Sequence, residues 1–142
     1  MYVDGYRSLT AWQTAQELCL RVLEATDGHL DRRAWAVVDQ LRRAALSVDI
    51  NIVEGYALGT PALFRRHLRI ALGSAAEAQR LLAIAETRRY LPQAAAAPLL
   101  KLADRTTGML YRLVRSPRLP FHPSGRQGQR LTANGQRPTA NG

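Results

Sequence analysis

Two apolar helical segments of this chain carry polar side chains at helical spacing, and this pattern constrains the fold more than any other feature. In the segment 40–55, Ser47, Asn51 and Glu54 are four and three residues apart and so share one helix face. Polar groups inside an apolar helical surface need hydrogen-bond partners. We therefore expect two helices to be held in one register by a structural polar network, made of Gln40, Ser47, Asn51, Glu54, Ser74 and Glu77.

A catalytic use of these polar residues is the alternative. It would require a nucleophile or a base whose pKa lies near neutral pH, and we expect none nearby. The three histidines, His29, His67 and His122, occur in different sequence contexts, and His67 is expected to be a hydrogen-bonded core residue. We predict no catalytic residue, no metal site and no cofactor, so that the protein is not an enzyme.

Caps and helix breakers divide the chain into helical segments. The first is predicted over about 9–26, with Ser8 as its N-cap and Asp27-Gly28 as its stop. Asp31 is the candidate cap of the second, which continues to about residue 55. The third begins at Thr60-Pro61, a cap followed by proline at the first helical position, and runs to about residue 89.

The fourth segment is predicted to begin somewhere between Pro92 and Pro98 and to end at Ser116-Pro117. Because proline is unfavourable inside a helix, we place its firm start near Pro98. The connections between these segments are short, which makes neighbouring helices antiparallel. The sequence thus predicts an all-α fold, an antiparallel up-down-up-down four-helix bundle over residues 1–116, followed by a disordered basic tail over residues 117–142.

The charge of the chain favours an acidic partner. Its 142 residues include 20 basic and 11 acidic ones, for a formal charge of +9, and a strong positive balance favours nucleic acid as a partner. Without the four arginines of the tail the charge is +5, and this excess lies on the third and fourth segments.

The single cysteine, Cys19, is expected to be a small buried side chain. No apolar run is long enough to cross a bilayer, and we expect a cytoplasmic protein without membrane contact.

The second segment carries two apolar stripes. Val38, Leu41, Val48 and Ile52 belong to the first, and the second consists of Trp35, Leu46, Ile50 and Val53. One stripe suffices in a monomeric bundle, so the second stripe favours a homo-oligomer. The alternative is that it packs under the tail or a neighbouring helix.

The third segment is expected to bury a face that includes Leu63, Phe64, Ile70 and Leu82, with Gly73-Ser74 allowing another backbone to come close. Arginines line up on its opposite side. Such a row can follow the phosphates of a nucleic acid, although a solvated face that keeps an apolar helix soluble is the simpler interpretation. The candidate phosphate contacts, without base specificity, are Arg65, Arg69, Arg80, Arg112 and Arg115.

The segments 40–55 and 64–77 closely resemble the four-helix bundle family first described as 23S rRNA intervening-sequence proteins. The family pattern Gln-Leu-Arg-Arg-Ala-x-x-Ser-Ile-x-x-Asn-Ile-x-Glu-Gly is matched over residues 40–55, and Phe-x-x-Phe-Leu-x-Ile-Ala-x-Gly-Ser-x-x-Glu over residues 64–77. His67 stands where the family usually has an aromatic residue. The resemblance covers roughly residues 8–115.

The resemblance implies an antiparallel bundle that assembles into a ring, commonly a pentamer. The accessory protein of diversity-generating retroelements, a basic barrel that binds a reverse transcriptase and nucleic acid, looks like a relative. We therefore expect a non-enzymatic, homo-oligomeric, basic helical protein that binds RNA or DNA, or a nucleic-acid-processing partner such as a reverse transcriptase. The alternative is a structural or protein-adaptor module whose charge serves solubility or docking to an acidic protein.

Overall fold

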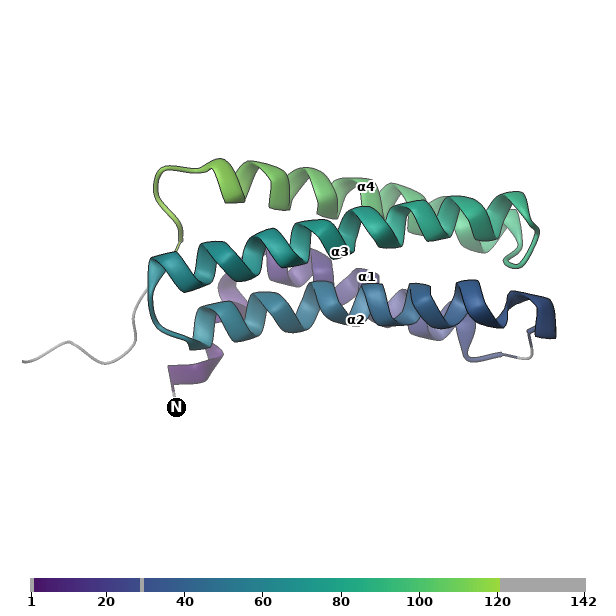
Figure 1. Cartoon of the computed structure of the whole chain (residues 1–142), viewed down its shortest axis with the longest axis horizontal. Coiled ribbons are helices and arrows are strands. Elements are labelled where there is room, and N and C mark those ends of the chain that lie inside the picture. The colour runs from purple at the N-terminus through teal and green to yellow at the C-terminus, as the bar shows by residue number, and fades with distance from the viewer. Residues whose placement is uncertain (1, 29, 121–142) are drawn as a thin grey trace, which may run out of the picture.

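The chain folds into a bundle of four α-helices. The computed structural model describes residues 2–28 and 30–120, which contain a short 3-10 helix η1 (Tyr2–Ser8), α1 (Thr10–Thr26), a 3-10 turn η2 (Arg32–Ala34), α2 (Trp35–Ala57), α3 (Pro61–Thr87) and α4 (Gln93–Arg115). Consecutive helices are antiparallel and each packs against two others (Figure 1). The predicted all-α up-down-up-down bundle is confirmed. From residue 121 on, the predicted disordered tail lies outside the described residues.

Side-chain caps set two of the helix starts as the sequence predicts. The Thr60 hydroxyl oxygen accepts a hydrogen bond from the Leu63 amide at 3.2 Å, with Pro61 at the first helical position of α3. Asp31 accepts from the Arg33 amide at 2.9 Å and caps η2, which continues directly into α2. Hydrogen bonds from Arg33 lower the pKa of Asp31 to about 2, so this cap stays ionised at neutral pH.

The predicted cap of α1 is wrong. The Ser8 hydroxyl donates to the Gly5 carbonyl at 2.9 Å, within η1. The N-cap position of α1 is taken by Leu9, which makes no side-chain cap bond and is instead buried in the core. Burial of an apolar side chain thus replaces a hydrogen-bonded cap at this helix start.

The start of α4 lies within the predicted range between Pro92 and Pro98, but the firm start placed near Pro98 is wrong. The helix begins at Gln93 and contains Pro98 inside it. The residues before Pro98 are four alanines, which have the highest helix propensity, and Ala96 is fully buried. Pro98 lies in the second turn, where it removes one backbone hydrogen bond near the helix end. Packing and propensity outweigh that loss.

The core runs the length of the bundle as two clusters. Toward the α3–α4 turn it contains Leu18, Leu41, Leu82 and Leu99, and toward the α2–α3 turn it contains Ile52, Phe64, Leu68 and Leu110. Alanines between these side chains, such as Ala45 and Ala75, are fully buried and let the helices come close. Ile70 was expected in this core, but it is 44% exposed because the buried positions of α3 follow Phe64, Leu68, Ala71 and Ala75 instead.

The end of α3 contains a non-glycine residue in the left-handed region. Arg89 has φ of 57°, and the following amide of Tyr90 donates to the Ala85 carbonyl at 2.8 Å. The Arg89 amide itself donates to the Glu86 carbonyl at 3.0 Å. This pair of bonds defines a Schellman cap, whose left-handed position usually holds glycine.

We predict that Arg89→Gly raises the free energy of unfolding by about 0.5–1 kcal/mol, because glycine adopts this conformation without the steric penalty that a Cβ brings. The matched control is Arg88→Gly, one residue earlier, where the backbone is right-handed with φ of −81°. There glycine should lower stability by roughly 1 kcal/mol. Urea unfolding of both variants measures the effect, and a loss of stability in both would contradict the assignment of strain to Arg89.

Candidate nucleic-acid interface

Polar side chains connect α2 and α3 along one seam. The Ser47 and Ser74 hydroxyl oxygens lie 2.8 Å apart. The Asn51 amide nitrogen donates to the Ser47 carbonyl at 2.9 Å and to its hydroxyl at 3.0 Å. Two turns toward the start of α2, the Gln40 amide donates to a Glu77 carboxylate oxygen at 2.6 Å. Serine against serine joins the two helices at one register.

His67 completes the seam at the α2–α3 turn end. Its ring nitrogen Nδ1 lies 3.0 Å from the Asn51 side-chain oxygen and 3.8 Å from a Glu54 carboxylate oxygen. The His67 side chain is 18% exposed, so it is largely buried and hydrogen-bonded. The structure therefore pairs Asn51 and Glu54 with His67, whereas sequence reasoning sought their partners among Ser74 and Glu77.

Gly55 is what allows His67 to come so close to α2. A Cβ atom at Gly55 would lie 2.5 Å from the Cβ of His67 and 3.2 Å from the ring of Phe64. Contacts this short require the helices to move apart. The glycine that follows Glu54 is thus a packing requirement of the seam.

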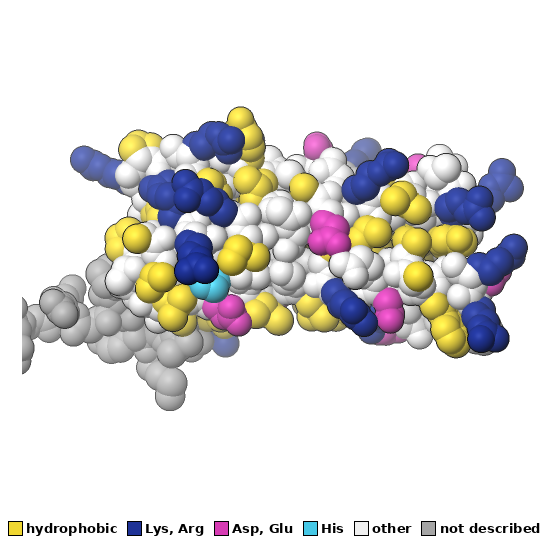
Figure 2. Space-filling model, in the orientation of Figure 1, with side chains coloured by type: hydrophobic (Ala, Val, Ile, Leu, Met, Phe, Trp, Pro, Cys, Tyr) yellow, Lys and Arg dark blue, Asp and Glu magenta, His cyan; other side chains and the backbone are white. Residues whose placement is uncertain are grey.

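Positive charge gathers at one end of the bundle. The α3 segment 61–76 and the segment 105–120 of α4 and its exit carry seven arginines and no acidic residue. The two segments lie side by side, because Arg65 of α3 contacts the end of α4 and Gln79 contacts Asp104. Figure 2 shows Lys and Arg side chains over this part of the surface. We call these seven residues the basic end: Arg65, Arg66, Arg69, Arg105, Arg112, Arg115 and Arg118.

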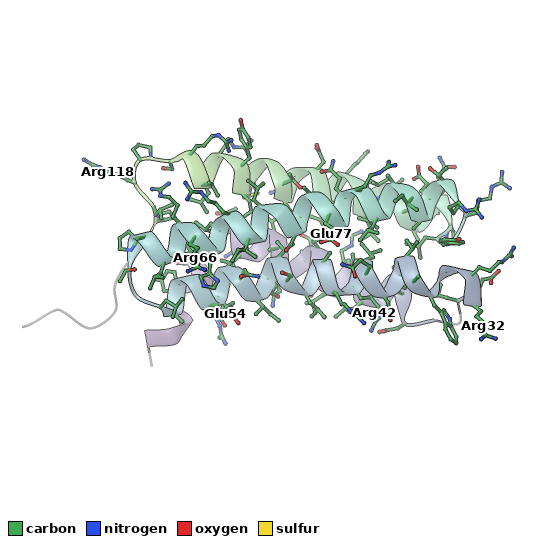
Figure 3. The ribbon with its side chains drawn as sticks, in the orientation of Figure 1. Arg32, Arg42, Glu54, Arg66, Glu77 and Arg118 are labelled. Carbon is green, nitrogen blue, oxygen red and sulfur yellow. The ribbon has the colours of Figure 1, made fainter. Side chains whose placement is uncertain are left out.

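The labelled side chains show which charged residues lie at each end of the bundle. Arg66 and Arg118 lie at the same end, with Glu54 nearby on α2, whereas Arg32 and Arg42 lie toward the opposite end (Figure 3). Arg42 donates to Asp27 at 3.0 Å and to the Thr26 hydroxyl at 2.7 Å. Arg32 has its guanidinium 6.0 Å from the centre of the Trp35 ring. The arginines of the opposite end are therefore mixed with acidic and aromatic partners.

Arg65 has a structural contact as well as a charge. Its guanidinium donates to the Val114 carbonyl and, at 3.0 Å, to the Ser116 carbonyl. These carbonyls end α4, where the helix dipole favours a positive charge and the last carbonyls lack helical partners. Arg65 thus caps α4, and its replacement would disturb the fold together with any ligand contact.

The other predicted arginines occupy different positions. Arg69 and Arg112 are exposed at the basic end. Arg115 lies with its guanidinium carbon 3.5 Å from the centre of the Tyr111 ring. Arg80 is exposed but lies about 16 Å along the helix axis from Arg69, near the Gln40–Glu77 pair. The structure therefore places four of the five predicted arginines at one end of the bundle and leaves Arg80 apart. Of the four, Arg112 lies on the α1 side of α4, in a pocket with Leu9 and Ala11.

Sequence reasoning missed several features of this surface. Arg66 and Tyr111 are exposed at the basic end, and the lack of acidic residues around them was visible in the sequence. Among the described residues, no backbone makes the close approach expected at Gly73, because no described atom lies within 4 Å of a Cβ placed there. Gly73 instead lies on the exposed side of α3.

The second apolar stripe of α2 faces outward. Trp35, Leu46 and Ile50 are 60%, 38% and 48% exposed, respectively, and Val53 is half-buried. The alternative that a neighbouring helix covers this stripe is therefore wrong. The tail, the other cover considered, lies outside the described residues from residue 121 on.

Two kinds of feature are absent from the part of the chain that the structure describes. None of its helices combines the length and the apolar character that crossing a bilayer requires. Within residues 2–28 and 30–120, no three His, Cys, Asp or Glu side chains come close enough to bind a metal ion together.

Fold and surface define a small, basic four-helix bundle protein. The sequence model of the family described as 23S rRNA-intervening sequence protein matches residues 7–112, and the chain belongs to this family. A crystal structure of a protein with unknown function from the S23 ribosomal protein family of Bacteroides thetaiotaomicron VPI-5482 has a similar fold, with a TM-score of 0.63 and 17% identity over 75% of this chain and 100% of that chain. No curated protein matches.

We predict that Gly55→Ala lowers the free energy of unfolding by about 1–3 kcal/mol, because the added methyl group meets His67 and Phe64. The matched control is Gly108→Ala on α4, where the new Cβ would lie 3.4 Å from the mobile end of Arg112. There the higher helix propensity of alanine should raise stability by up to about 1 kcal/mol. Thermal and urea unfolding distinguish the two, and equal effects would show that Gly55 is not needed for the close approach of α2 and α3.

Proposed function

We propose that the protein is a non-enzymatic, homo-oligomeric module that binds nucleic acid through its basic end. The observation that carries this proposal is the pair of packed segments, 61–76 and 105–120, with seven arginines and no acidic residue. Surface arginines that serve only solubility are usually interspersed with acidic residues, as at the opposite end of this bundle. A positive surface on rigid helices suits the phosphates of a nucleic acid.

RNA is the ligand that the family membership favours. The family takes its name from the intervening sequence of 23S rRNA, which supports RNA as the acidic partner. Arg66, Arg69 and Arg112 are assigned to phosphates, without base specificity. Arg65 contributes its charge from its capping position on α4. A nucleic-acid-processing protein such as a reverse transcriptase would then be brought to the same RNA.

Self-association is the second part of the proposal. The outward stripe of α2 exposes Leu46 and Ile50, while the acidic and polar seam separates it from the basic side of α3. A second copy of the chain is its proposed occupant, since contiguous exposed apolar surface marks an interaction site. A contact between different surfaces of neighbouring copies forms a ring when the rotation between them closes, and we propose such a ring, in which each copy keeps its basic end accessible.

We predict that replacing Arg66, Arg69 and Arg112 together by glutamine weakens binding of a structured RNA on the order of 100-fold at about 0.1 M salt and lowers the salt slope by about 2–3, because three phosphate contacts are lost. Fluorescence anisotropy across a salt series measures both quantities. The matched control replaces Arg32, Arg43 and Arg88 by glutamine, which removes the same charge from exposed positions outside the basic end.

The control triple variant should retain nearly the wild-type affinity and slope. An equal loss in both triple variants would show a diffuse electrostatic attraction without a defined interface. Failure of the wild-type protein to bind any RNA would contradict the proposal and favour the protein-adaptor alternative.

We predict that Leu46→Gln combined with Ile50→Gln dissociates the oligomer, because two polar side chains would be buried at the subunit contact without partners. Each subunit should keep its stability, since surface substitutions change it by about 0.5 kcal/mol or less. The control is Leu20→Gln with Leu58→Gln, two residues that are similarly exposed, at 56% and 50%. Light scattering coupled to size exclusion measures the mass, and an unchanged mass in the first variant would remove α2 from the interface.

A further inference from the structure

The basic end exposes an aromatic ring among its arginines. Tyr111 on α4 is 50% exposed, and the guanidinium carbon of Arg115 lies 3.5 Å from its ring centre. Arg115 also donates to the Tyr111 carbonyl at 3.4 Å. The ring is therefore held on a rigid helix with a planar cation against it, an arrangement stabilised by cation–π attraction.

The level of Tyr111 along the bundle is set by the contacts between α3 and α4. Arg65 bonds to the Ser116 carbonyl and Gln79 bonds to Asp104, so successive turns of the two antiparallel helices pair in order. In this register Arg69 lies at the level of Tyr111. Phosphate-binding charge and an exposed ring thus occur together on the outer side of the α3–α4 pair.

We propose that Tyr111 and Arg115 form a stacking platform for an unpaired nucleobase, so that the basic end prefers single-stranded nucleic acid or unpaired loops over a duplex. This inference rests on the proposed function and names its ligand class more closely. Proteins that bind single strands combine a positive surface for the backbone with aromatic side chains on which bases stack. A duplex keeps its base faces stacked inside, so it offers such a platform nothing but phosphates and sugars.

A tyrosine and an arginine four residues apart on a helix surface can also pair without any ligand. The charge around the pair is what indicates a ligand. Around Tyr111, the segment 105–120 has four arginines and no carboxylate, so a polyanion is drawn to the surface where the ring is exposed. Because Arg115 already orients the ring, little side-chain freedom is lost when a base stacks on this unit.

The inference is tested by comparing one short single-stranded RNA with the duplex formed from it and its complement. Tyr111→Ala should weaken binding of the single strand by ~5- to 100-fold and leave binding of the duplex unchanged. Its salt slope should stay at the wild-type value, because the ring carries no charge. Tyr111→Phe keeps the ring and should bind both ligands as the wild type does.

Arg69→Gln is the second control, since it should weaken both RNAs alike and lower the salt slope by about 1. Equal effects of Tyr111→Ala on strand and duplex, or no effect on either, would overturn the stacking platform while leaving the basic end as an RNA interface. A wild-type protein that binds neither RNA would overturn the proposed function itself. Circular dichroism melting of each variant ensures that folded proteins are compared.

Discussion

The close contact between α2 and α3 is the constraint on which the rest of the structure depends. Ser47 and Ser74 meet at 2.8 Å, and Gly55 leaves room for His67 to pack against α2 and reach Asn51. A shift of either helix by one turn would break these bonds and bring side chains into collision. With the register fixed, the buried positions of α3 are Phe64, Leu68 and their successors, and Arg66 and Arg69 face outward.

Because these arginines face outward, a bundle with an ordinary apolar core has an uneven distribution of charge on its surface. Arg65 fixes the position of α4 along α3, because its guanidinium donates to the carbonyls that end α4. The two arginine-bearing segments, widely separated in the sequence, are thereby placed side by side. The positive surface is a consequence of helix packing and needs no loop or added domain.

The sequence was sufficient for features that depend on local chemistry. The Thr60-Pro61 start of α3, the antiparallel order and the polar residues of the seam follow from caps, short connections and helical spacing. It was insufficient where tertiary packing overrides a local rule. Pro98 lies inside α4 because four alanines, of which Ala96 is buried, precede it. Ile70 is exposed because Phe64, Leu68 and Ala71 are the positions of α3 that face the core. The capping role of Arg65 and the setting of Tyr111 depend on a neighbouring helix, which spacing along one helix does not reveal.

The central claim is that the basic end, rather than the whole positive surface, binds nucleic acid. Hydrogen–deuterium exchange of the full chain with and without a structured RNA, at low salt, tests it most directly. The account predicts added protection in the segments 61–76 and 105–120, and its loss when the salt concentration is raised. Protection centred on η2 and the α3–α4 turn, or no protection anywhere, would contradict it.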